Sequence, residues 1–179
     1  YEVSRRIRTL LRTPNWGFSL AASTLVGQQL GRDRSDEAHG YGRDILRFSL
    51  AVHLVFGAAV LVFARPIAGV FVDEASALAA TTPFVRIAAI SVLGLSIEGV
   101  TNGVLKSSGD TRWPMYGKLL GLYAVAVPVA FLGTVTSLGV AGLYLALLFQ
   151  SFVPAVVSAH RFRSGAWKEA VPSADAGAD

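Results

Sequence analysis

Five apolar segments, each bounded by charged or turn-forming residues, constrain this chain more than any other feature. Only 16% of its 179 residues are charged, against roughly a quarter in soluble domains, and the deficit lies in these segments. About twenty apolar residues, at about 1.5 Å per residue, cross the hydrocarbon core of a bilayer as a helix. The pattern therefore predicts an all-α integral membrane bundle with spans at about 15–30, 45–64, 83–105, 114–132 and 138–160. The first reaches bilayer thickness only if its helix begins a few residues earlier.

Prolines mark where the later spans begin and where they bend. Pro83 and Pro114 each precede an apolar run, and proline is tolerated in the first turn of a helix, so we expect both to open a span. Pro128 and Pro154 lie inside spans, where proline removes a backbone donor and kinks the helix.

Polar stretches separate the spans and end the chain. Residues 31–44 are predicted to form a loop, residues 67–82 an interfacial connector and residues 106–113 a turn. We assign residues 1–168 to one membrane bundle and expect residues 169–179 to be a disordered tail, because they are small, acidic and contain proline. An odd number of spans and a first residue other than Met suggest a piece of a longer protein.

The basic residues are distributed unevenly between the two ends of the predicted bundle. Cytoplasmic loops are enriched in Lys and Arg. Ten basic residues fall on the side of loop 31–44 and six on the other, where four belong to the N-terminal run from Arg5 to Arg12. We therefore expect loops 31–44 and 106–113 and the C-terminus to be cytoplasmic. The Arg5–Arg12 run has no nucleic-acid recognition fold around it, so contact with membrane lipid is the preferred interpretation.

Glu98 is the candidate functional residue, because it lies about eight residues inside the third span. A carboxylate at that depth is costly and is usually retained to bind an ion, carry a proton or pair with a cation. Asn102 lies four residues later on the same helix face, where it could donate to the carboxylate or share a cation. His53, inside the second span, is a candidate proton relay. The alternative for each is a structural hydrogen bond between helices.

Three further residues are candidates for lining a substrate cavity: Gln150, Tyr123 and Tyr144. The aromatic rings could attract cations, or they could pack within the bundle. Other chemistry finds little support in the residues. The chain has no Cys and no cluster with metal-ligand spacing. It also lacks the motifs of phosphate loops, zinc proteases and serine hydrolases, which argues against an enzyme built on His53 and Glu98.

Two motifs at helix ends resemble signatures of the multidrug and toxic compound extrusion (MATE) family. The stretch from Gly17 to Gly31 resembles the family's "lvGQ-x-lGa" pattern, with Gly27, Gln28 and Gly31 at its defining positions. The stretch from Gly103 to Thr111 resembles its "G-x-L-R-G-x-G-D-T" turn, with Gly109 and Asp110. Residues 161–168 (RFRSGAWK) are similar to the sequence that follows the family's last helix. Lys106 stands where the family usually has Arg, and many members have an acidic residue in this helix near Leu95, about one turn before Glu98.

The resemblance implies that the chain corresponds to about helices 8 to 12 of a twelve-helix transporter made of two pseudo-symmetric bundles. Such proteins exchange protons or sodium ions for amphipathic, often cationic compounds by alternating access. This implies no cofactor beyond the ion gradient, and an N-terminal bundle of the same protein as partner. Two alternatives remain: a flippase for lipid-linked precursors, which would need a more cationic cavity, and a membrane assembly subunit that does not itself transport.

Overall fold

The computed structural model describes residues 2–72, 74–137 and 139–170, and the side chains of 14–72, 74–137 and 139–169 within them. Helices, with no strand among the described residues, make up the fold. They are α1 (Glu2–Leu30), α2 (Ser35–Val62), α3 (Ala64–Gly69), α4 (Ala75–Ser107), α5 (Arg112–Leu119), the π-helical η1 (Leu120–Ala126), α6 (Val127–Val135), α7 (Val140–Ser164) and the 3₁₀ turn η2 (Ala166–Ala170). The predicted all-α architecture is confirmed.

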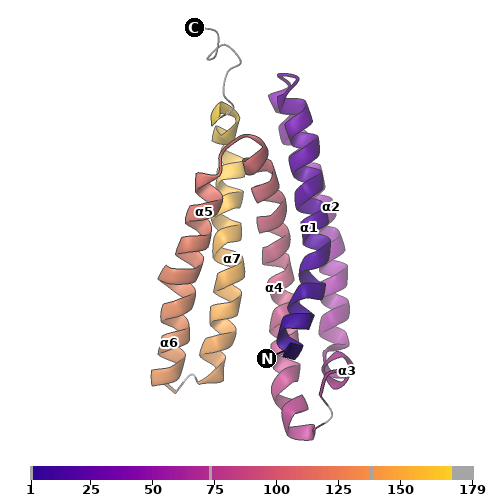
Figure 1. The fold of residues 1–179 in the computed structure, drawn as a ribbon, viewed down its shortest axis with the longest axis vertical. Helices are drawn as coiled ribbons and strands as arrows, with labels where there is room; N and C mark the ends of the chain where they lie inside the picture. Colours follow the sequence, from indigo (N-terminus) through magenta and orange to yellow (C-terminus); the bar gives the residue numbers. More distant parts are fainter. Residues whose placement is uncertain (1, 73, 138, 171–179) are drawn as a thin grey trace.

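Helix α4 is the centre of the bundle. It packs against α1 and α2 on one side and against α7 on the other, and the α5–η1–α6 rod packs on α7 (Figure 1). Of the helices, α4 has the longest run of buried residues, from Glu98 to Leu105. Because α4 joins both groups of helices, a polar side chain on it has packed neighbours that shield it from solvent and lipid.

Four helical stretches within the described residues are long and apolar enough to cross a membrane. They are Ser35–Val62, Ala75–Ser107, Arg112–Val135 and Val140–Ser164. The first predicted span, 15–30, is helical inside α1 but is not among the four. Its small and polar residues, such as Ser19, Ser23 and Gln29, lower its hydropathy.

The helices extend further than the hydropathy pattern predicted. The predicted loop 31–44 shrinks to a turn, because α2 already begins at Ser35 and its polar first ten residues precede the apolar stretch 45–62. Likewise, α4 begins at Ala75, so Pro83 lies inside the helix rather than opening it. The predicted connector 67–82 is therefore divided between the end of α3 and the first turns of α4.

The chain's end also differs in part from the prediction. Residues 166–170 form η2, and Trp167 within it is fully buried. The expected disordered tail 169–179 therefore starts inside an ordered turn, and its residues 171–179 lie outside the described part. Pro114 lies in the first turn of α5, close to its predicted place.

Two apolar clusters fill the interior, one toward each end of α4. The first joins α2, α3 and α4 through Val60, Ala64, Ala68, Val85, Ala88, Ala89 and Val92. The second joins α1, α2, α4 and the end of α7 through Ala22, Val26, Leu30, Ala38, Val100, Val104, Leu105, Phe162 and Trp167. Of the polar residues of α4 that matter below, Ser96 and Glu98 lie between the two clusters along the helix, and Asn102 lies at the level of the second cluster.

Candidate functional site

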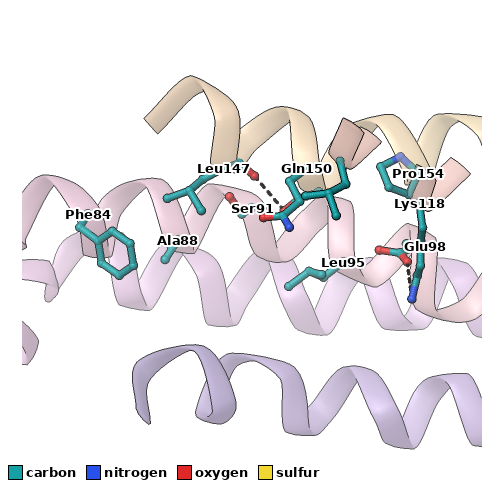
Figure 2. Close-up of a pocket in the computed structure, with 11 residues that line it drawn as sticks. Phe84, Ala88, Ser91, Leu95, Glu98, Lys118, Leu147, Gln150 and Pro154 are labelled. Carbon is teal, nitrogen blue, oxygen red and sulfur yellow. Dashed lines mark hydrogen bonds and ion pairs between the residues drawn. The ribbon is translucent and has the colours of Figure 1, made fainter. Parts of the chain in front are cut away.

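A cavity of about 250 Å³ lies along the side of α4 that faces α5, η1 and α7 (Figure 2). Its wall is mostly apolar, with a few polar groups at intervals, which is typical of small-molecule sites. The lining residues are Phe84, Ala88, Ser91, Leu95, Glu98, Lys118, Leu122, Leu147, Gln150, Ser151 and Pro154. Two predicted site residues, Glu98 and Gln150, therefore line the same cavity. Leu95, about one turn before Glu98, lines it as well.

Glu98 is held within a chain of side-chain hydrogen bonds. Glu98 as a whole is 9% exposed, and its Oε1 accepts a hydrogen bond from Nδ2 of Asn102 at 3.2 Å. The Oγ of Ser158 on α7 donates in turn to Oδ1 of Asn102 at 2.8 Å. The predicted donation from Asn102 to the carboxylate is therefore present, because four residues bring both side chains to one face of α4. Ser158 fixes which way the amide points.

Lys118 is the cationic partner of Glu98. Its Nζ lies 3.4 Å from Oε1 of Glu98, and the two side chains point toward each other across the cavity (Figure 2). This role is not predicted from the sequence, where Lys118 is one of the ten basic residues on the side of loop 31–44. The available signal was a lysine four residues inside a segment that opens at Pro114.

His53 occupies a different part of the bundle. It is 1% exposed, and its Nδ1 lies 2.8 Å from the carbonyl oxygen of Ser49, to which it donates. The hydroxyl of Ser49 is also hydrogen-bonded to that of Ser96 on α4, at 2.8 Å. His53 is not among the residues that line the cavity, and its ring packs at a tilt on that of Phe18. The structure thus does not join His53 to Glu98.

Neither candidate tyrosine lines this cavity. Tyr123 is 66% exposed, and its neighbour Leu122 faces the cavity instead, because successive helical positions point in different directions. The hydroxyl of Tyr144 donates to the carbonyl oxygen of Ala80 at 3.4 Å. This bond joins α7 to the start of α4 and gives Tyr144 a packing contact.

The signature residues lie at one end of the bundle. Gly27 packs near Ser107 of α4, and Gly31 ends α1. Gln28 is exposed, whereas its neighbour Gln29 is 7% exposed, so Gln29 and not the signature glutamine packs inside the bundle.

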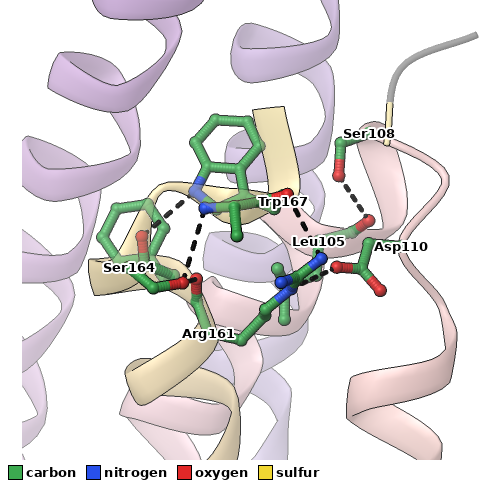
Figure 3. A network of polar contacts seen from close by, with 8 residues as sticks. Leu105, Ser108, Asp110, Arg161, Ser164 and Trp167 are labelled. Carbon is green, nitrogen blue, oxygen red and sulfur yellow. Dashed lines mark hydrogen bonds and ion pairs between the residues drawn. The ribbon is translucent and has the colours of Figure 1, made fainter. Parts of the chain in front are cut away.

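Asp110 and Gly109 form the turn between α4 and α5, and this turn is tied to α7. Gly109 has a φ of 82°, a backbone conformation that glycine adopts without strain. The Nε of Arg161 donates to Oδ2 of Asp110 at 2.6 Å, and the Asp110 side chain is 7% exposed (Figure 3). Arg161 also lies over the ring of Trp113 at 5.5 Å and donates to the carbonyl oxygen of Ala166.

The same end of the bundle holds α2 against η2. His39, Phe162 and Trp167 form a stack of rings, and Nζ of Lys168 lies 2.8 Å from Oδ1 of Asp36. Asp36 and His39 both precede the apolar stretch of α2. The hydrogen bond from Lys168 lowers the pKa of Asp36, and burial, followed by the charge of Lys168, lowers the pKa of His39. These contacts hold the end of the described chain on the bundle.

The sequence matches a known family and several curated relatives. A model of the MatE family matches residues 1–132. The chain is 24% identical over 94% of its length to the "Probable multidrug resistance protein NorM" of Thermotoga maritima, and covers 37% of that protein. It is 32% identical over 73% of its length to a protein of the same description from Deinococcus radiodurans, covering 30% of it. It is 26% identical over 78% of its length to "Multidrug and toxin extrusion protein 1" of Oryctolagus cuniculus, covering 25% of it. The chain thus spans about a third of the length of such relatives.

The fold has a counterpart among solved structures. The eukaryotic MATE transporter AtDTX14 superposes with a TM-score of 0.86 over 95% of this chain and 38% of that one, at 20% sequence identity. At this identity the likeness establishes the fold alone.

Proposed function

We propose a function from the premise that the chain belongs to the MatE family of membrane transporters. The members of this family are transporters, which removes the intramembrane enzyme considered from the sequence. The protein that contains this chain is, in our proposal, a multi-pass efflux antiporter that exports amphipathic, cationic small molecules in exchange for protons or sodium ions. This chain supplies most of its second bundle, and an N-terminal bundle of the same protein supplies the other face of the transport path.

A buried carboxylate in a mostly apolar cavity is the observation that carries this proposal. Glu98 lines a cavity of about 250 Å³ together with Phe84 and Gln150. A carboxylate there attracts a cation, and apolar walls favour the hydrophobic part of an amphipathic compound. The cavity is somewhat smaller than the roughly 300–1,000 Å³ usual for drug-sized ligands. A second bundle facing it would enlarge the enclosed space.

A flippase for lipid-linked precursors is the alternative that one observation favours. It predicts a cationic cavity that would bind phosphate groups, and the cavity does contain Lys118. However, the ammonium of Lys118 is paired with Glu98, so the cavity offers no excess of positive charge to a phosphate group. The carboxylate is also the more buried member of the pair, with 11% of its side chain exposed against 61% for Lys118. Export of cationic compounds is therefore preferred.

Transport of a fluorescent cationic dye tests the proposal. Everted vesicles containing the full-length protein would be given a proton or a sodium gradient, and dye movement would be compared between wild type and Glu98→Gln. We expect wild type to move dye when a gradient is imposed and Glu98→Gln to lose most of that dependence. Glu37→Gln, the same change at an exposed acid in the first turn of α2, is the matched control and should behave as wild type. Equal transport by Glu98→Gln and wild type would place the coupling carboxylate elsewhere.

A further inference from the structure

Lys118 places a positive charge at the one carboxylate that the proposed function uses. Its Nζ lies 3.4 Å from Oε1 of Glu98, the same oxygen that accepts the amide of Asn102. The side chains that approach from α7, such as Ser151 and Ser158, are uncharged. A cation that enters the cavity and binds Glu98 therefore meets an ammonium that already occupies the carboxylate.

The backbone beneath Lys118 is held in place by close helix packing. A Cβ on Gly117 would lie 3.2 Å from Cα of Pro154, and a Cβ on Gly121 would lie 2.9 Å from Cδ of the same proline. These two glycines flank Lys118 by one residue and by three, so α5 and η1 touch α7 almost backbone to backbone. The lysine thus has a fixed attachment point above the cavity.

The side chain of Lys118, in contrast, has room to move. It is 61% exposed, whereas that of Glu98 is 11% exposed. A buried carboxylate with no counter-charge is costly, so the pair stabilises Glu98 while nothing else is bound. An ion pair with one exposed member is weak, because water competes for the ammonium. The lysine therefore neutralises Glu98 when the cavity is empty. Because the ion pair is weak, another cation displaces the lysine at a small cost in free energy.

We propose that Lys118 is a tethered counter-cation of Glu98, which pairs with the carboxylate in the empty cavity and swings away when a cationic substrate or an alkali cation binds there. This rests on the proposed function, in which Glu98 is the cation site. By competing, Lys118 lowers the affinity of every cationic ligand and promotes its release. It sets the affinity of the site for cations by acting through Glu98.

Equilibrium binding of radiolabelled tetraphenylphosphonium to the purified full-length protein tests this inference. Lys118→Gln should bind the probe about two- to fivefold more tightly than wild type, the range expected when a weak ion pair no longer competes. Lys118→Arg keeps the charge and should bind as wild type does. Lys106→Gln, at an exposed lysine near the end of α4 outside the cavity lining, should also leave the affinity unchanged.

A double variant separates competition from a general effect of charge. In a Glu98→Gln background, Lys118→Gln should no longer raise the affinity, because the carboxylate for which the lysine competes is gone. Lys118→Met, which keeps the apolar stem, gives the same test if Lys118→Gln folds poorly, and a thermal melt of each variant monitors the fold.

The outcomes for this inference and for the proposed function are distinguishable. Weaker binding by Glu98→Gln together with unchanged binding by Lys118→Gln and Lys118→Met would overturn the inference and leave the proposed function standing. A tighter Lys118→Gln whose gain persists in the Glu98→Gln background would also overturn it. If wild type neither binds the probe nor moves dye under either gradient, the proposed function fails and the inference fails with it.

Discussion

Glu98 lies at one end of a polar chain that crosses from α4 to α7. Asn102 donates to the carboxylate and accepts from Ser158, whose residue is fully buried. The side-chain amide of Asn102 thus donates through Nδ2 and accepts through Oδ1 at the same time. Because the two atoms have different partners, the orientation of the amide is fixed. Both Asn102 and Lys118 contact Oε1, so among the described residues the second oxygen of the carboxylate, Oε2, is left to interact with a ligand in the cavity.

Sequence periodicity predicts only the part of this chain that lies on one helix. Asn102 follows Glu98 by four residues, which places both side chains on one face whatever the rest of the fold does. Ser158 and Lys118 lie on other helices. Whether their side chains reach α4 depends on how α7 and α5 are rotated about their axes and shifted along them relative to α4. An apolar stretch records that a helix lies in the membrane but not its rotation, so these partners are visible only in three dimensions.

Removing the hydroxyl of Ser158 should weaken both the fold and the site. Ser158→Ala leaves Oδ1 of Asn102 buried without its donor. We expect the free energy of unfolding to fall by about 1 kcal/mol. This value lies between the ~0.6 kcal/mol average for hydrogen bonds in membrane proteins and the ~1–3 kcal/mol cost of an unsatisfied buried group. Denaturant unfolding of the purified full-length protein measures it, and tetraphenylphosphonium binding should weaken in parallel.

The exposed hydroxyl of Ser164, which donates to the carbonyl oxygen of Arg161, provides the control for this change. Ser164→Ala should alter the unfolding free energy much less and leave probe binding as in wild type. Ser158→Ala with wild-type stability and binding would mean that Asn102 has another donor and that its orientation does not depend on α7.

Helix α4 packs closely against its neighbours at glycines, which leave room for the adjacent backbone. A Cβ on Gly103 would lie 2.4 Å from the carbonyl oxygen of Ser19 on α1, and a Cβ on Gly94 would lie 2.9 Å from the carbonyl oxygen of Ser151 on α7. Small residues at helix interfaces allow backbones to approach where no hydrophobic force between helices exists in lipid. The position of Glu98 between α1 and α7 therefore depends on these contacts.

Substituting Gly103 should separate α1 from α4, whereas substituting a glycine in open space should not. We expect Gly103→Ala to lower the unfolding free energy by about 1–3 kcal/mol, the usual cost of overpacking, since the atom it meets is backbone and cannot rotate away. Gly40 in the polar part of α2 has nothing within 4 Å of its would-be Cβ, so Gly40→Ala should gain up to about 1 kcal/mol from helix propensity. Thermal denaturation of both variants compares their stabilities. A Gly103→Ala protein as stable as the Gly40→Ala protein would contradict the close contact between Gly103 and Ser19.

At the element scale, the sequence predicts helices better than it predicts their ends. Hydropathy locates the apolar part of α2 at 45–62, but a helix continues into water wherever its polar residues support it, and α2 begins ten residues earlier. Pro83 was expected at a helix start, yet α4 runs through it, because membrane bundles tolerate a proline whose freed carbonyl finds another partner. Both differences arise because hydropathy measures the membrane environment rather than backbone hydrogen bonding.

At the scale of the whole molecule, the turns fall into two groups at opposite ends. The turns after α1 and α4 and the end of α7 lie together, and the turn between α6 and α7 lies at the far end with α3 (Figure 1). The first end carries Arg32, Arg34, Lys106, Arg112, Arg161, Arg163 and Lys168, whereas Arg65 and Arg86 lie toward the second. Positive charge near the ends of spans favours the cytoplasmic side, so we propose that the first end is cytoplasmic.

Single cysteines test this orientation cleanly, because the chain has no cysteine of its own. Arg32→Cys, in the exposed turn after α1, should react with a membrane-impermeant maleimide only after the cells are permeabilised, provided other cysteines of the full-length protein are removed. Ser137→Cys, in the exposed turn between α6 and α7, should react in intact cells. Each position is a control for the other, because Ser137→Cys must be labelled in intact cells and Arg32→Cys must be labelled only after permeabilisation. The reverse pattern would mean that the N-terminal arginines, or helices outside this chain, override the charge at the first end.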